Sequence, residues 1–288
     1  MTASQRIPST EEQLVLAVTS APHDDAPRRA YADWVRPSDP KRARLIDVQL
    51  ARAADARTTR LPNSKAIEEG ILAAHAQRWS YTLLKYVRRA DYYRGFVEEI
   101  AIDPYLFLEY GEFLFVNWPI LSVSFIQPEE GPFPLDELAA SPLLARLNGI
   151  ALKRGVVDDA AVEKFAASPH LENCHTLDLS HNVLTIRAFE ALARNPSTRK
   201  LLVVARDRNG RLDTQYHPKA QLQATDRLDR WDCVISEWGP MSPEGQALER
   251  KYGYIPWLHR ENSCHQLDAH WFVQNGVLPV QPVGSPVE

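Results

Sequence analysis

The chain has 288 residues, of which 44% are hydrophobic and 24% charged, and its formal net charge at pH 7 is -4. This composition is typical of a globular protein, and the acidic balance gives no reason to expect nucleic acid as a partner. The sequence contains no apolar run long enough to span a bilayer, and its polar N-terminus lacks the apolar core of a secretion signal. Three cysteines without a paired motif favour a reducing compartment. We therefore expect a cytoplasmic protein with no membrane partner.

The first 60 residues predict a small helical module. Residues 9–20 begin with a helix-capping pattern, Ser9 or Thr10 followed by Glu12 or Gln13. The apolar residues that follow recur at the spacing of one helical face. The sequence therefore predicts an amphipathic helix over this segment.

The next stretch, HDDAPRRAYADWV at 23–35, combines a second helix start with a dense set of charged and aromatic side chains. Asp24 or Asp25 can cap this helix. Tyr31 and Trp34 lie on one face of it, so both rings are expected to be buried.

Two interpretations of the charged residues in this stretch are open. His23, Asp24, Asp25 and Asp33 could form a metal-binding or acid–base cluster. Alternatively, each has a local structural task, with the two neighbouring aspartates as caps and Asp33 paired with Arg29 one turn earlier. The second interpretation is favoured because capping and helix pairing account for these residues without any chemistry.

A third amphipathic helix is expected from Lys41 to about Ala56. Residues 11–53 as a whole resemble the bacterial repeat-companion domain, a helical module with the pattern P-x-D-D-x-x-R-x-x-Y-A-D-W-L followed by an Arg-rich stretch and an Ile-x-x-Gln-Leu helix. Here VRPSDP replaces the acidic turn that usually follows the Trp. The resemblance implies a bacterial module that precedes leucine-rich repeats and has no established activity. The matching positions are Pro22, Asp24, Asp25, Arg28, Tyr31, Ala32, Asp33, Trp34, Ile46, Gln49 and Leu50.

The middle of the chain contains an internal repeat, visible when residues 143–169 are aligned with residues 170–196. Each 27-residue unit begins with apolar residues at every second position and continues with a helical pattern. Asp158 and Thr185 stand at equivalent helix starts. A fixed period of one strand and one helix predicts a solenoid that buries a continuous core by stacking.

Apolar residues recur at the same interval and form columns of expected core positions. The first two columns run through neighbouring strand positions, and the others through the end of the strand and the helix. They are Ile120, Leu147, Cys174 and Leu201; Val123, Ile150, Leu177 and Val204; Phe125, Leu152 and Leu179; Leu138, Phe165 and Leu192; and Ala139, Ala166 and Ala193.

Residues 174–184, CHTLDLSHNVL, resemble the leucine-rich-repeat pattern L-x-x-L-x-L-x-x-N-x-L, with Cys174 in the first Leu place and Asn182 in the Asn place. The unit length resembles the ribonuclease-inhibitor-like class. We therefore expect an α/β fold, a short leucine-rich-repeat-like solenoid of about five parallel strands from 97 to 207 with outer helices. An N-terminal helical module and an irregular C-terminal cap would complete it.

The expected division of the chain is a helical module at 1–60, the solenoid with a linking helix at 61–209, a Trp-rich cap at 210–276 and a disordered tail at 277–288. Within the cap, residues 242–253 predict a helix that ends at Gly253.

Side chains between the core columns would line an exposed polar face of the sheet, which suits protein recognition. The alternative is a solvated face with no partner. The residues expected to bind a partner are Glu99, Asp103, Ser122, Ser124, Lys153, Arg154, Thr176, Asp178, Ser180, His181 and Arg208.

The sequence thus predicts a non-catalytic protein that recognises a protein partner through this face or through the Trp-rich segment, with no cofactor and no small-molecule substrate. One alternative is an inhibitor or immunity-type protein with a single tight partner. Another is a metal-dependent enzyme, although the spacing of its candidate ligands matches no standard zinc pattern. Those ligands would be His259, Cys264, His265 and His270.

Overall fold

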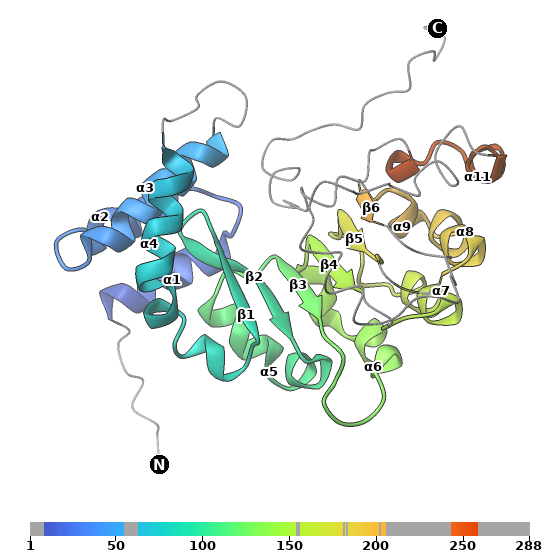
Figure 1. Ribbon diagram of the computed structural model, residues 1–288, viewed down its shortest axis with the longest axis horizontal. Helices are drawn as coiled ribbons and strands as arrows, with labels where there is room; N and C mark the ends of the chain where they lie inside the picture. Colours follow the sequence, from blue (N-terminus) through green and yellow to red (C-terminus); the bar gives the residue numbers. More distant parts are fainter. Residues whose placement is uncertain are drawn as a thin grey trace, which may run out of the picture. The chain divides into compact units, whose positions relative to one another are not determined.

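The structure is a computed structural model that describes residues 9–54, 63–153, 156–180, 182, 184–201, 203–205 and 243–258 (Figure 1). It is a mixed α/β protein with mostly parallel strands, and it divides into two compact units between Ser124 and Phe125. Among the helices that the structure describes, none is both long and apolar enough to cross a bilayer.

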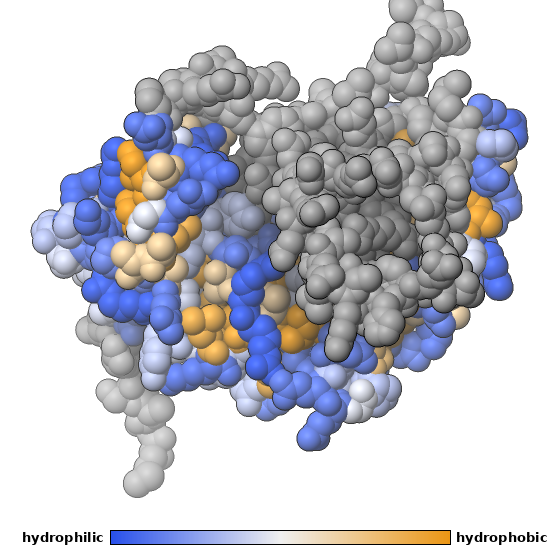
Figure 2. All heavy atoms as spheres, viewed as in Figure 1, coloured by the Kyte–Doolittle hydropathy of each residue, from blue (hydrophilic) through white to orange (hydrophobic). Residues whose placement is uncertain are grey.

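The first unit begins with four helices, α1 (Thr10–Ser20), α2 (Ala26–Val35), α3 (Pro40–Ala54) and α4 (Ser64–Trp79). The predicted start of α1 is confirmed: the Ser9 hydroxyl accepts from the Glu12 N–H at 3.2 Å, and the Glu12 carboxylate accepts from the Ser9 N–H at 2.7 Å. Hydrophilic side chains cover most of the surface seen over α2 in Figure 2. Beneath them, apolar residues that include Val18 and Ile46 form a core.

The buried face of α2 differs from the expected one. Tyr31 is buried against the Phe96 ring, with the ring centroids 5.1 Å apart, but Trp34 keeps 39% of its surface exposed. The prediction that both rings are buried was therefore wrong for Trp34. The inward face of α2 is formed by Arg28, Tyr31, Ala32 and Val35, and Trp34 lies outside this set of buried positions.

The strands of the first unit are β1 (Arg89–Tyr93), β2 (Phe96–Ile102) and β3 (Ser122–Phe125), which are neighbours in that order. The short helix η1 (Leu83–Lys85) precedes β1, and α5 (Pro104–Asn117) links β2 to β3. In the view of Figure 1, α5 lies behind β1 and β2.

A tight turn joins β1 to β2 in an antiparallel hairpin that was not expected from the sequence. Its two central residues, Arg94 and Gly95, have φ of 46° and 85°, which suits the turn that matches the twist of paired strands. A Cβ atom on Gly95 would lie 2.2 Å from Cγ1 of Ile46 in α3. Gln49 of α3 also accepts from the Gly95 N–H at 2.7 Å, so the hairpin tip is held closely against this helix.

The second unit contains the strands β4 (Gly149–Leu152), β5 (Thr176–Asp178) and β6 (Val203–Ala205), which pair in parallel. Ile150 is the register partner of Leu177, and Leu177 is the partner of Val204. The predicted alignment of these three residues on neighbouring strands is therefore confirmed. The helices around the strands are α6 (Leu135–Ala140), η2 (Pro142–Arg146), α7 (Asp159–Ala166), α8 (Ile186–Arg194) and α9 (Pro196–Arg199).

The expected helix starts of α7 and α8 are also confirmed. The Asp158 carboxylate accepts from the Ala161 N–H at 2.8 Å, and the Thr185 hydroxyl accepts from the Arg187 N–H at 3.3 Å. The column members whose side chains the structure describes are buried, because each strand and helix of a unit turns the same positions inward. Buried members include Leu147, Cys174 and Leu201 in one column and Leu138, Phe165 and Leu192 in another.

The predicted helix near the C-terminus is present as α11 (Pro243–Tyr252), followed by Gly253 with φ of 82° and by η4 (Pro256–Leu258). Trp257 is buried, with its ring 6.3 Å from that of Phe189 in α8. Lys251 pairs with Glu190 of the same helix at 2.7 Å. Residues 243–258 thus pack against the last long helix of the repeat.

Candidate functional site

A charged group lies where β4 and β5 end, and it consists of Lys153, Asp178 and Ser180. Lys153 Nζ is 2.7 Å from Oδ2 of Asp178. The other oxygen, Oδ1, accepts from the Ser180 N–H at 3.0 Å and from the Ser180 hydroxyl at 2.5 Å. Parallel strands bring their carboxyl ends to one edge, which places these residues together. We call this group the strand-end cluster.

The strand face around the cluster is less exposed than expected. Thr176, Asp178 and Ser180 are buried, although the sequence predicted exposed side chains at these positions. Both oxygens of Asp178 are occupied by neighbours, and Thr176 is a small residue on a strand that is paired on both sides. Of the cluster, the Lys153 side chain keeps 32% of its surface exposed.

Glu99 and Asp103 belong to the first unit and have local partners there. Glu99 on β2 accepts from Arg89 on β1 at 2.8 Å, which joins the two strands of the hairpin. Asp103 was expected on the strand face, but it caps α5, where its carboxylate accepts from the Tyr105 N–H at 2.8 Å. This expectation was wrong because β2 ends at Ile102.

The remaining predicted residues fall into two groups. Ser122 is buried and Ser124 is half-buried on β3, so the expected exposure of Ser122 was also wrong. Arg154, His181 and Arg208 lie outside the described residues.

Asn182, singled out by its place in the repeat pattern, joins two successive units. Its amide donates to the carbonyl oxygens of Leu152 at 2.6 Å and Leu179 at 2.8 Å. Its Oδ1 accepts from the Val157 N–H at 3.3 Å. The side chain is buried and satisfies backbone groups that would otherwise be unpaired after the strands.

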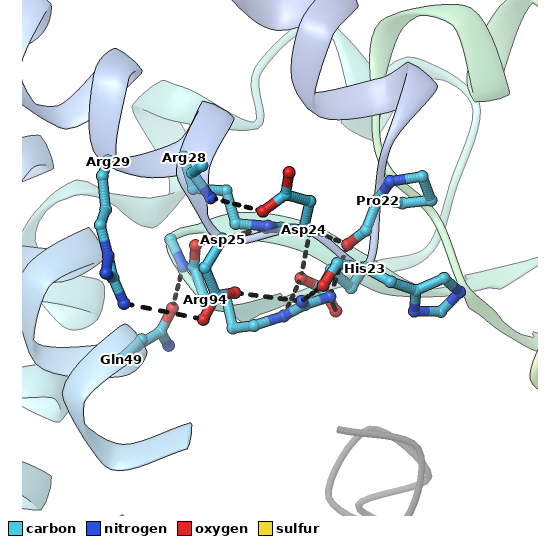
Figure 3. A network of polar contacts seen from close by, with 11 residues as sticks. Pro22, His23, Asp24, Asp25, Arg28, Arg29, Gln49 and Arg94 are labelled. Atoms are coloured by element: carbon cyan, nitrogen blue, oxygen red, sulfur yellow. Dashed lines mark hydrogen bonds and ion pairs between the residues drawn. The ribbon is translucent and has the colours of Figure 1, made fainter. Parts of the chain in front are cut away.

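The stretch at 23–35 contributes to a buried polar network that joins α2 to the β1–β2 hairpin (Figure 3). Arg28 Nη2 lies 2.8 Å from Glu98, and two nitrogens of Arg94 each donate to Glu98 at 3.1 Å. Both guanidinium groups also donate to the Pro22 carbonyl, and Arg94 pairs with Asp25 at 3.3 Å. Burial lowers the pKa of Arg28 to about 10 despite the carboxylate beside it.

The aspartates of this stretch have structural partners, as the favoured interpretation proposed. Asp24 accepts from the Ala26 N–H at 2.9 Å at the start of α2, while Asp25 makes no cap hydrogen bond. The expected pair of Arg29 with Asp33 is replaced by two others. Arg29 lies 3.9 Å from Asp25, and Asp33 lies 3.3 Å from Arg36.

His23 takes part in the network through its backbone, since its carbonyl accepts from Arg94 at 3.3 Å and its imidazole points away from the carboxylates in Figure 3. Within the part of the chain that the structure describes, no three His, Cys, Asp or Glu side chains gather in a way that could hold a metal ion. The C-terminal candidates His259, Cys264, His265 and His270 lie outside that part.

Arg94 and Glu98 were not singled out from the sequence. A usable signal was present, because Arg-Gly between Tyr93 and Phe96 is a two-residue turn flanked by strand-forming residues. The ion pair of Glu98 with Arg28 gives no such signal in the sequence, since the two residues lie far apart along the chain.

A second buried guanidinium, that of Arg42, lies among aromatic rings of the first unit. Its Cζ is 4.9 Å from the Trp79 ring centroid and 5.0 Å from that of Tyr92. The nearby Tyr31 hydroxyl donates to Glu11 at 3.2 Å. Burial raises the pKa of Tyr31 to about 12, and Arg42 opposes this shift.

Comparisons with family models, with curated proteins and with solved structures find no match to this chain.

Proposed function

We propose that the chain is a non-catalytic interaction protein that recognises a protein partner through the strand face of its repeat, at the strand-end cluster. The strand–helix units are proposed to form a short leucine-rich-repeat-like solenoid, preceded by the helical module of α1, α2 and α3. The observation that supports this proposal most is the register of Ile150, Leu177 and Val204, which repeats at the interval read from the sequence.

Two further features support a repeat of this kind. Asn182 links its own unit to the preceding one through hydrogen bonds to two backbone groups, the Leu152 carbonyl and the Val157 N–H. Thr185, at the start of α8, also links its unit to the preceding one, because its N–H donates to the Asp159 carboxylate at 2.8 Å. Units that interlock in this way present their strands as one ordered surface, a geometry that suits extended protein contacts.

Lys153 is the proposed contact residue of the cluster. Asp178 holds the ammonium at the strand ends. The Lys153 side chain as a whole keeps 32% of its surface exposed, and the proposal is that a partner reaches it there. An ammonium has three donors, so Lys153 can bind a carboxylate or a carbonyl of the partner while it keeps its bond to Asp178. Because Asp178 already holds the Lys153 side chain in place, little further ordering of that side chain is needed when a partner binds.

The test is affinity capture with the full chain as bait, with Lys153→Gln compared with Lys164→Gln. Lys164 is a matched control because it pairs with an aspartate, Asp136, at 2.8 Å but lies on the outer helix α7. We expect the wild type and Lys164→Gln to enrich the same protein, and Lys153→Gln to recover it at least about tenfold less.

Thermal unfolding of the two variants shows whether each remains folded. Equal recovery by Lys153→Gln and Lys164→Gln, or enrichment of no protein by the wild type, would contradict the proposal.

A further inference from the structure

We draw no further inference here: the strongest candidate, the exposed aromatic surface of η1 and α5 that includes Tyr81, Phe113 and Val116, is interrupted by the exposed Glu109, and nothing in the structure shows what covers it.

Discussion

Arg28 on α2 and Glu98 on β2 form an ion pair at 2.8 Å in which neither side chain has exposed surface. A single buried pair offsets its desolvation cost poorly, but here Arg94 adds two charge-assisted hydrogen bonds to the same carboxylate. The network also holds Arg94 at its positive φ in the hairpin turn. The polar stretch at 23–35 therefore fixes the position of the hairpin against the helices.

Glu98→Gln should destabilise the protein strongly, because it removes the carboxylate that two buried guanidinium groups share. We expect a loss of about 3–5 kcal/mol in the free energy of unfolding, measured with urea. Glu163→Gln removes a carboxylate from an exposed pair with Arg194 and should cost less than about 1 kcal/mol. Similar small losses for both variants would contradict a structural role for Glu98.

Gly95→Ala should be among the most damaging small changes in the first unit. The added methyl would lie 2.2 Å from Ile46, and the residue would keep a positive φ. We expect a loss of at least about 2 kcal/mol in a denaturant titration. Gly70→Ala in α4 is the matched control, since the new methyl would meet nothing within 4 Å beyond its chain neighbours and the backbone of its own helix. The free energy of unfolding should rise by up to about 1 kcal/mol in this variant. A neutral Gly95→Ala would mean that the hairpin tip does not pack on α3.

Asn182→Ala should weaken the coupling between repeat units, because three buried backbone groups lose their partner. The expected cost is about 2–4 kcal/mol, measured by thermal or urea unfolding. Asn117→Ala serves as the control, since Asn117 is exposed and donates within its own helix to the Phe113 carbonyl. It should change the stability by less than about 0.5 kcal/mol. Equal effects would show that Asn182 does not join the units.

Tyr31 should make the folded state sensitive to high pH. Its pKa of about 12 in the folded protein lies above the ordinary value of 10.0, so the folded state keeps a proton that the unfolded state loses. This stabilising contribution is complete below pH 10 and falls away as the pH rises toward 12. Between pH 10 and pH 12, the free energy of unfolding of the wild type should fall by roughly 1–3 kcal/mol more than that of Tyr31→Phe. Parallel curves of unfolding free energy against pH for the two proteins would refute this assignment.

The features predicted correctly from the sequence are those set by local pattern. The 27-residue interval fixed the register of Ile150 with Leu177, because each unit repeats the same order of strand and helix. The caps at Asp158 and Thr185, and the helix end before Gly253, follow from side-chain chemistry within a few residues. Such signals need no knowledge of what lies across the fold.

The features missed from the sequence depend on distant partners. The exposure of Trp34 follows from the burial of Arg28, which requires Glu98 on another element. In the same way, the sequence pattern predicted an exposed Asp178. The pattern within one strand does not reveal the ion pair of Asp178 with Lys153, which follows the neighbouring strand. The residues of the candidate site were thus identified by position, while their burial was set by contacts that the pattern does not encode.

The most direct test of the account is a measurement of strand register in solution by nuclear Overhauser contacts between backbone protons of the perdeuterated, amide-protonated chain. Parallel pairing at the repeat interval predicts cross-strand contacts around Ile150 and Leu177, and again around Leu177 and Val204. Contacts that join Leu177 to residues at a different interval, or antiparallel contacts between these segments, would contradict the repeat and with it the proposed binding face.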